Sequence, residues 1–178
     1  TDERVFQWRH PTPKETKRLG KYAMLVICGR WQGLWACATR LIHFGEPPDE
    51  LREKMKAVAT VDATFIGHTT PGAQVRDIWE KALAAYADGG WPQEWQLHHQ
   101  GGACGYAPRD YRATPTLEET VLGNQAFAWN PSIQGTKSED TILATADGPE
   151  ILTTTPDWPL LEAEAAGRKW PRADILVR

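Results

Sequence analysis

The chain has 178 residues, of which 41% are hydrophobic and 24% are charged, and its formal net charge is −3. This amount of apolar sequence is enough for one well-buried core, and it excludes a disordered tail and a disulfide-stapled miniprotein. Because 20 basic residues nearly balance 23 acidic ones, there is no electrostatic case for nucleic acid or an anionic membrane as a partner.

The hydropathy pattern and the cysteines exclude further classes of protein. No stretch approaches the roughly 18 apolar residues that cross a bilayer, because the longest one, 22–28, has the length of a strand. Cys28, Cys37 and Cys104 form an odd set without C-x-x-C spacing, which favours free thiols and a cytoplasmic location. The chain begins with Thr1, neither an initiator methionine nor the start of a secretory leader, so we expect a piece of a longer protein.

The first half of the chain predicts a hairpin followed by two helices. The runs 21–28 and 33–44 are apolar and are joined by a short connection, which predicts two paired, mostly buried strands. After Pro47-Pro48, apolar residues recur at helical spacing over 51–65, which predicts an amphipathic helix of about five turns. The same period recurs over 75–86, before two glycines end the second helix.

The second half predicts strands. Short apolar runs separated by Gly, Pro, Asn and Thr occur at 95–98, 125–129, 140–145 and 150–154. The order of two strands, two helices and several strands indicates an α+β fold rather than alternating β and α units. Without an internal repeat or linker, we expect residues 1–178 to form a single domain.

Three polar clusters lie among these strands. The densest, 97–106, contains His98, His99 and several glycines, which indicates tight backbone geometry or close approach of a ligand. The other two are Asn130-Pro131 and the segment 135–141 just before a strand. Taken singly, each is equally consistent with a loop, and the first with a glycine-rich turn carrying solvated histidines.

Together these clusters resemble the catalytic domain of the creatinase, aminopeptidase P and methionine aminopeptidase family, whose fold is called pita-bread. Residues 37–40 stand at the place of the family's D-x-T-R, and 98–105 resemble its H-x-x-G-H-x-x-G block. Asn130-Pro131 resembles the E-P pair, and 137–140 resemble R-x-E-D. The resemblance implies a curved antiparallel sheet with helices packed on its outer face, and a further N-terminal domain outside this sequence.

The sequence departs from the family pattern at the positions of the metal ligands. The resemblance implies five ligands for two divalent ions, but an ungapped count puts Val26, Cys37, Gly102 and Asn130 at four of those positions. Only Glu139 keeps a ligand-type side chain. Two ions need several anionic oxygens to offset their charge, so we expect no metal and no cofactor.

The resemblance also implies roles for the remaining polar residues. Creatinase, the metal-free member of the family, implies that an imidazole can transfer protons in this pocket, which His98 or His99 would do here. Arg109 would bind a carboxylate, since its planar guanidinium suits that group. The predicted catalytic set is His98, His99 and Glu139, and the predicted substrate-binding set is His10, Arg109, Asn130 and Lys137. We expect His98 or His99 to converge on one cavity with Arg109, Asn130 and Glu139. We also expect an open cleft lined by some of Trp31, Trp35 and Trp129.

Four alternatives remain open at this stage. The first is an Xaa-Pro aminopeptidase- or dipeptidase-like hydrolase that acts without metal on a small or peptide-like substrate, in a homodimer. The second is a non-catalytic binding module on the same fold. The third is a rearranged metal site of His98, His99, Glu139 and Asp140. An argument against it is that adjacent histidines on an extended segment point to opposite faces. The fourth is a nucleophilic Cys37 or Cys104, although each reads more simply as a small buried residue.

Overall fold

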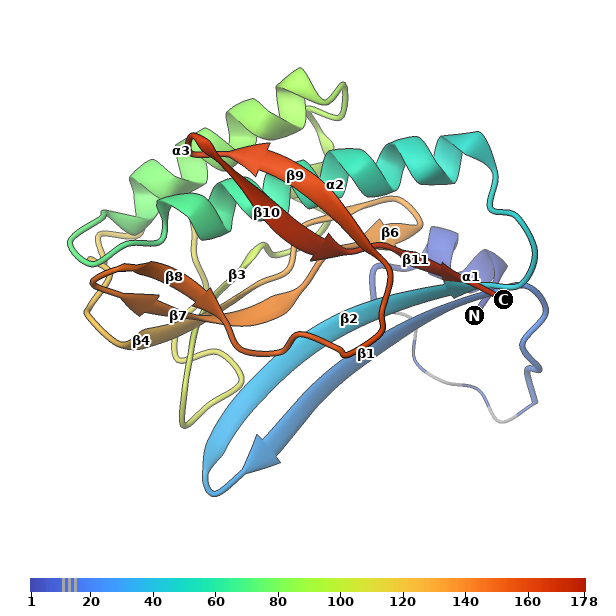
Figure 1. Cartoon of the computed structure of the whole chain (residues 1–178), viewed down its shortest axis with the longest axis horizontal. Helices are drawn as coiled ribbons and strands as arrows, with labels where there is room; N and C mark the ends of the chain where they lie inside the picture. Colours follow the sequence, from blue (N-terminus) through green and yellow to red (C-terminus); the bar gives the residue numbers. More distant parts are fainter. Residues whose placement is uncertain (11, 13, 15) are drawn as a thin grey trace.

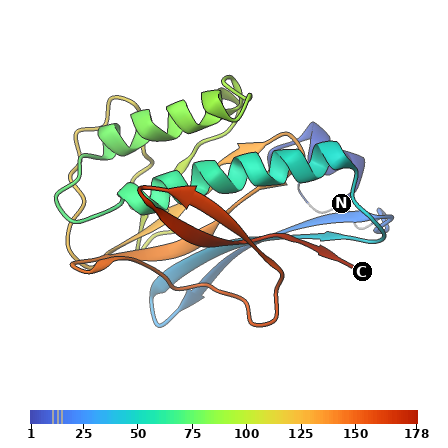
Figure 2. The same cartoon turned by 45° about the horizontal axis from the view of Figure 1, so that its top comes forward.

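The computed structural model describes residues 1–10, 12, 14 and 16–178. Two long helices cover one face of a layer of strands (Figures 1 and 2). The helices are α1 (Glu3–Gln7), α2 (Asp49–His68), α3 (Val75–Asp88) and a short 3-10 helix, η1 (Glu94–Leu97). The strands are β1 (Tyr22–Trp31), β2 (Leu34–His43), β3 (Gly101–Cys104), β4 (Gln125–Trp129), β5 (Ser132–Ile133), β6 (Thr136–Lys137), β7 (Asp140–Thr145), β8 (Gly148–Ile151), β9 (Leu160–Ala165), β10 (Arg168–Ala173) and β11 (Ile175–Val177).

The strands form two larger sheets and two small ones. β1 and β2 make the predicted antiparallel hairpin, and β11 joins the other edge of β2 in parallel. The second sheet is antiparallel in the order β3-β4-β7-β8, while β9 pairs with β10 and β5 pairs with β6. The α+β architecture is therefore as predicted.

The core lies between α2 and the second sheet. Phe127 and Trp129 lie two positions apart on β4, so their side chains face the same side of the sheet. Phe65 of α2 stacks on Trp129 with ring centroids 4.4 Å apart, and the Trp129 indole donates a hydrogen bond of 2.9 Å to Thr69. Trp129 is fully buried, so the helices are fixed on the sheet by aromatic packing as well as by aliphatic contacts.

Two predicted strands differ from the structure. Residues 95–98 were expected to be a strand, but 94–97 form η1. Periodicity cannot distinguish strand from helix in so short an apolar run. The strand expected at 150–154 is β8, which begins earlier because the preceding turn closes at Gly148, whose carbonyl accepts a hydrogen bond from the Thr145 hydroxyl.

The strands β9 to β11 were not predicted. β9 and β10 are rich in Glu, Ala, Arg and Lys, which carry no strand signal of their own. Within the part of the chain that the structure describes, no helix is long and apolar enough to span a membrane.

Candidate functional site

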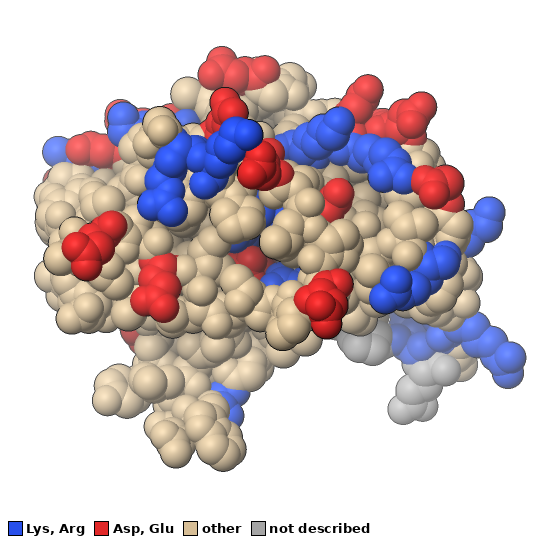
Figure 3. All heavy atoms as spheres, viewed as in Figure 1, with Lys and Arg blue, Asp and Glu red and all other residues tan. Residues whose placement is uncertain are grey.

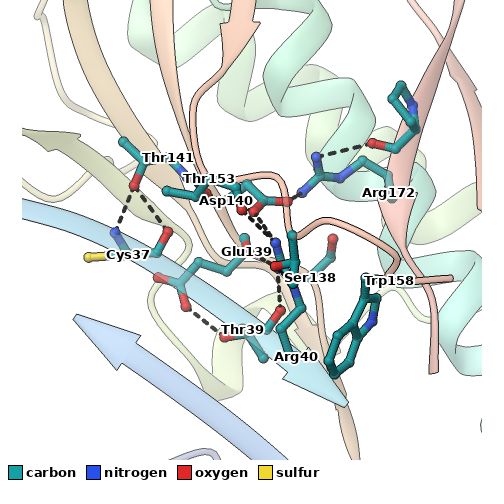
Figure 4. A network of polar contacts seen from close by, with 12 residues as sticks. Cys37, Thr39, Arg40, Ser138, Glu139, Asp140, Thr141, Thr153, Trp158 and Arg172 are labelled. Atoms are coloured by element: carbon teal, nitrogen blue, oxygen red, sulfur yellow. Dashed lines mark hydrogen bonds and ion pairs between the residues drawn. The ribbon is translucent and has the colours of Figure 1, made fainter. Parts of the chain in front are cut away.

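The centre of the site is the place where β2 of one sheet meets the start of β7 of the other. The Thr39 amide donates to the Glu139 carbonyl at 3.0 Å. The Thr141 hydroxyl accepts from the Cys37 amide at 2.7 Å and donates to the Cys37 carbonyl at 3.0 Å (Figure 4). These bonds link the two sheets and fix the position of Glu139.

Glu139 has partners on both carboxylate oxygens. The Thr39 hydroxyl donates to Oε2 at 2.7 Å, and Arg109 Nη2 pairs with Oε1 at 2.9 Å. The Glu139 side chain is only 1% exposed and that of Arg109 is 12% exposed, so solvent screens the pair weakly. Both carboxylate oxygens of Glu139 therefore have hydrogen-bond partners within the chain.

The other amino group of Arg109 contacts a thiol. Arg109 Nη1 lies 3.3 Å from Cys37 Sγ. Burial raises the pKa of Cys37 to about 12, although the Arg109 contact opposes the shift, and burial raises that of Cys104 to about 11. Both thiols stay protonated near neutral pH, which argues against the nucleophilic-cysteine alternative.

A cleft of about 650 Å³ opens beside this pair. It brings together five of the predicted site residues, two residues of β1 and the four residues of the 108–112 segment other than Arg109. The lining residues are His10, Val26, Cys28, His99, Pro108, Arg109, Asp110, Tyr111, Arg112, Asn130 and Glu139.

Two predicted site residues lie behind the wall of the cleft. His98 is buried, and its Nε2 lies 2.6 Å from Nε2 of His10, which does line the cleft. Lys137 is 1% exposed, and its Nζ has no hydrogen-bond partner among the residues described. Neither side chain contributes to the lining of the cleft.

The two adjacent histidines lie on the same side, contrary to the geometry of an extended segment. The rings of His98 and His99 stack with centroids 4.5 Å apart. The reason is local: β3 begins only at Gly101, and Gln100 Nε2 donates back to the His98 carbonyl at 2.6 Å. Residues 98–100 thus turn before the strand starts.

The histidines are neutral at physiological pH. Burial lowers the pKa of His98 far below its usual value, and the nearby Lys137 ammonium lowers it further. Burial lowers that of His99 to about 4, with Arg112 and Arg109 contributing. The interpretation of these histidines as groups that titrate near neutrality was wrong, because desolvation and neighbouring cations penalise the imidazolium.

His10, His98 and His99 are the one group of three potential metal ligands whose donor atoms lie within 4.8 Å of one another in the described part of the chain. A metal ion lies in the plane of each imidazole that binds it. The His10 and His99 rings are 17° from parallel, with centroids 5.5 Å apart. The surrounding Lys137, Arg109 and Arg112 repel a divalent cation.

Asp140 does not join the histidines. Its carboxylate faces away from Glu139, where Arg40 Nη2 and Arg172 Nη2 pair with its two oxygens at 2.8 and 2.7 Å (Figure 4). The rearranged metal site of His98, His99, Glu139 and Asp140 is therefore not assembled.

The tryptophan expectation was wrong. Trp129 belongs to the core, and the lining of this cleft, as far as the structure describes it, includes no tryptophan. Conversely, the sequence analysis missed Thr39 and Arg112. Thr39 could have been found, because it lies two residues after Cys37 on a strand and so shares its face. Arg112 carries no motif signal.

Comparison with known proteins agrees with this architecture. The sequence model of metallopeptidase family M24 matches residues 6–146. An uncharacterized peptidase of Staphylococcus aureus (strain MW2) is 26% identical over 151 residues, which are 81% of this chain and 43% of that protein. This chain thus spans less than half the length of the curated relatives it matches.

Solved structures show the fold. A dipeptidase from Pyrococcus horikoshii OT3 superposes with a TM-score of 0.75 at 19% identity, over 95% of this chain and 45% of that one. A prolidase from Pyrococcus furiosus gives 0.74 at 20%, over 82% and 45%. An X-Pro aminopeptidase from Thermotoga maritima MSB8 gives 0.70 at 18%, over 88% and 41%. By its family match and its pita-bread fold, this chain belongs to metallopeptidase family M24.

Proposed function

We propose that this chain binds a small, peptide-like ligand with a carboxylate in the cleft, and does so without a pair of metal ions. The observation that carries the proposal is the position of Arg109. Its guanidinium bridges Glu139 and Cys37, the residues at two of the five positions where the family resemblance implies metal ligands. The Arg109 guanidinium therefore contacts the two side chains, Glu139 and Cys37, that a metal ion at this place would need as ligands.

The remaining donors do not fit two divalent ions. Cys37 is a protonated thiol, and Asn130 offers a neutral amide oxygen. At Gly102 even a Cβ atom would lie 2.2 Å from the Tyr111 carbonyl oxygen, so this backbone has no room for an imidazole. Hard divalent ions need several anionic oxygens, and Glu139 alone does not supply them.

Unsatisfied polar atoms around the cleft support a carboxylate ligand. Arg109 Nε and Lys137 Nζ are buried donors without a hydrogen-bond partner among the described residues. Asn130 Oδ1 is a buried acceptor that also has no hydrogen-bond partner among them. A buried charge without a partner is costly, so an anionic ligand near Lys137 and Arg109 would recover part of that cost. An N–H of a peptide-like ligand would satisfy Asn130.

A second candidate function is metal-independent hydrolysis, which the contact between His10 and His98 favours. Because the two Nε2 atoms are 2.6 Å apart, one carries a proton and donates a hydrogen bond, which the other accepts. Such a neutral pair can take up a proton from a bound substrate or water and relay it between two rings. Burial lowers the pKa of His10, His98 and His99 alike, so the relay would pass a proton between rings without holding it as an imidazolium at neutral pH.

Binding and metal content test the first candidate. Isothermal titration calorimetry with the dipeptide Ala-Pro and with its C-terminal amide should show at least tenfold weaker binding of the amide. Arg112→Gln, in the lining, should weaken Ala-Pro binding at least fivefold. Lys81→Gln, on the exposed surface of α3, is the matched control and should leave the affinity unchanged.

Elemental analysis after incubation with Mn²⁺, Co²⁺ or Zn²⁺ completes the test. We expect less than stoichiometric metal and an unchanged melting temperature in chelator. Two ions per chain would refute the proposal. Release of proline from Ala-Pro, followed by proton NMR, would establish the second candidate, and His98→Gln should then abolish the release.

A further inference from the structure

The outer edge of β1 is a row of unpaired backbone groups beside the cleft. The Phe44 amide donates to the Lys21 carbonyl, and the antiparallel register runs on from there, so the odd-numbered residues of β1 bond to β2. The N–H and C=O groups of Met24, Val26, Cys28 and Arg30 point the other way. The described residues offer no backbone partner for these four positions.

This edge has few of the features that normally protect one, since Arg30 is the single charged residue of β1. Natural edge strands carry charges, prolines or covering segments, which prevent pairing with another chain. Here the side chains of Leu25, Val26 and Ile27 are 43%, 42% and 57% exposed, and Trp31 at the tip is 77% exposed. Figure 3 shows the hairpin tip as a projection covered mainly by uncharged atoms. A long, apolar, unpaired edge is a template for strand addition.

The edge is continuous with the cleft. Val26 and Cys28, whose backbone groups face outward, also contribute side chains to the lining that includes Arg109 and Arg112. A strand added to β1 would run about 4.8 Å from it and pass Val26 and Cys28, whose side chains share the cleft with Arg109 and Arg112. The positive charge of the cleft suits a chain that terminates in a carboxylate.

We propose that β1 accepts an extended peptide as an added strand, with alternating apolar side chains along 24–30 and its C-terminal carboxylate in the cleft. The inference rests on the proposed carboxylate site and extends it to longer ligands. Backbone hydrogen bonds would supply affinity with little dependence on sequence, and the cleft would select for the free C-terminus. Continuity with the cleft favours a peptide over a second copy of this chain as the occupant.

Amide exchange tests the geometry directly. The probe is a heptapeptide of alternating Thr and Val that ends in proline with a free carboxylate. Hydrogen exchange followed by NMR should slow at least tenfold at the amides of Met24, Val26, Cys28 and Arg30 when it binds. The amides of Leu25 and Ile27, which already bond to β2, are internal controls and should change less. Unchanged exchange at the even-numbered amides with bound peptide would overturn the inference.

A chemically matched peptide separates strand addition from side-chain binding. The same heptapeptide with N-methyl groups on alternate residues keeps every side chain but loses the donors, and it should bind at least tenfold more weakly. Equal binding would refute strand addition. In the protein, Val26→Pro removes one outward N–H, whereas Val26→Ala keeps it, so only the proline variant should lose more than threefold in affinity.

Three further outcomes bear on this inference and on the proposed function. If Ala-Pro binds but the heptapeptide binds no tighter and protects no edge amide, the strand inference fails and the carboxylate site stands. If neither binds, both fail. If the even-numbered amides become protected with rising protein concentration alone, and sedimentation shows a dimer, a second copy occupies the edge and the peptide assignment is wrong.

Discussion

Arg109 differs from a metal ion in what it can do to a ligand. Burial opposes the charge of Arg109, yet Glu139 and Cys37 raise its pKa, so it stays protonated. A guanidinium donates hydrogen bonds in a fixed plane but cannot lower the pKa of a bound water as a metal ion does. In the metal-independent site that we propose, the guanidinium would therefore favour recognition of an anion over activation of water.

The depressed pKa of His99 makes stability depend on pH. Its folded pKa of about 4 lies below the usual histidine value of 6.5, so between these values the unfolded chain binds a proton that the folded chain does not. The free energy of unfolding therefore falls as the pH drops from 6.5 to 4, by about 1 to 2 kcal/mol for a partly exposed group. Urea unfolding at pH 4.5 to 7.5 should show this slope, and His99→Asn should reduce it, while His98 and His10, whose pKa values are also lowered, account for the remainder.

The matched control is His68→Asn. His68 lies at the end of α2, where its Nδ1 contacts the Thr64 carbonyl, outside the cleft. This variant should keep the slope of the wild-type chain. An equal slope in His99→Asn would mean that acid sensitivity arises from other groups, and the account of the cleft as a desolvated, cationic environment would need revision.

Site residues could be predicted from the sequence where a motif fixes their place on a strand. Glu139, Asn130 and Arg109 are brought to one cleft, as the motif order indicates. The protonation states could not be predicted, because they depend on burial and on cations such as Lys137 that meet the histidines only in the folded chain. His98 and His99 illustrate this: their types are visible in the sequence, but their stacking and neutrality are not.

At the scale of elements, β3 shows how glycine permits close packing of strands. Gly102 has a φ of +150°, and a Cβ there would lie 2.2 Å from the Tyr111 oxygen and 2.9 Å from the Ala113 nitrogen. Because both neighbours are backbone atoms, they cannot move aside cheaply. The glycine-rich block is therefore a packed strand, and the sequence indicated only that its backbone was special.

Gly102→Ala should destabilise the fold by more than about 2 kcal/mol in urea unfolding. The matched control is Gly123→Ala, because a Cβ at Gly123 meets nothing within 4 Å and should change stability by less than about 0.5 kcal/mol. If both variants were equally stable, β3 could shift to admit a side chain. The argument that position 102 cannot carry a ligand imidazole would then fail.

Elements with strong local signals were predictable, and those that depend on tertiary context were not. The hairpin of β1 and β2 and the helices α2 and α3 follow from apolar runs and helical periodicity. β10, with the sequence RKWPRA, has no such pattern, and it becomes a strand because β9 pairs with it and Trp170 packs into the core.

At the scale of the whole molecule, one arginine joins three parts of the fold. Arg172 of β10 pairs with Asp140 of β7 at 2.7 Å and donates from Nε to Asp62 of α2 at 3.0 Å. The Arg172 and Asp62 side chains are fully buried, and that of Asp140 is 4% exposed. The C-terminal hairpin thereby neutralises two carboxylates that the helix and the central sheet bury, and Asp140 is the residue directly after Glu139.

Arg172→Met should therefore cost about 3 to 5 kcal/mol in urea unfolding, because it leaves Asp62 buried without a cation while Asp140 keeps only Arg40. Lys169→Met, on the same strand, is the matched control. Its pair with Glu162 is mostly exposed, and its loss should cost less than about 1 kcal/mol. Adding Asp62→Leu to Arg172→Met should recover part of the stability, since it removes the unpaired charge. If Asp62→Leu lowered the stability of Arg172→Met as much as it lowers that of the wild-type chain, the two residues would not be coupled. The hairpin would then be held by the packing of Trp170 and by β11.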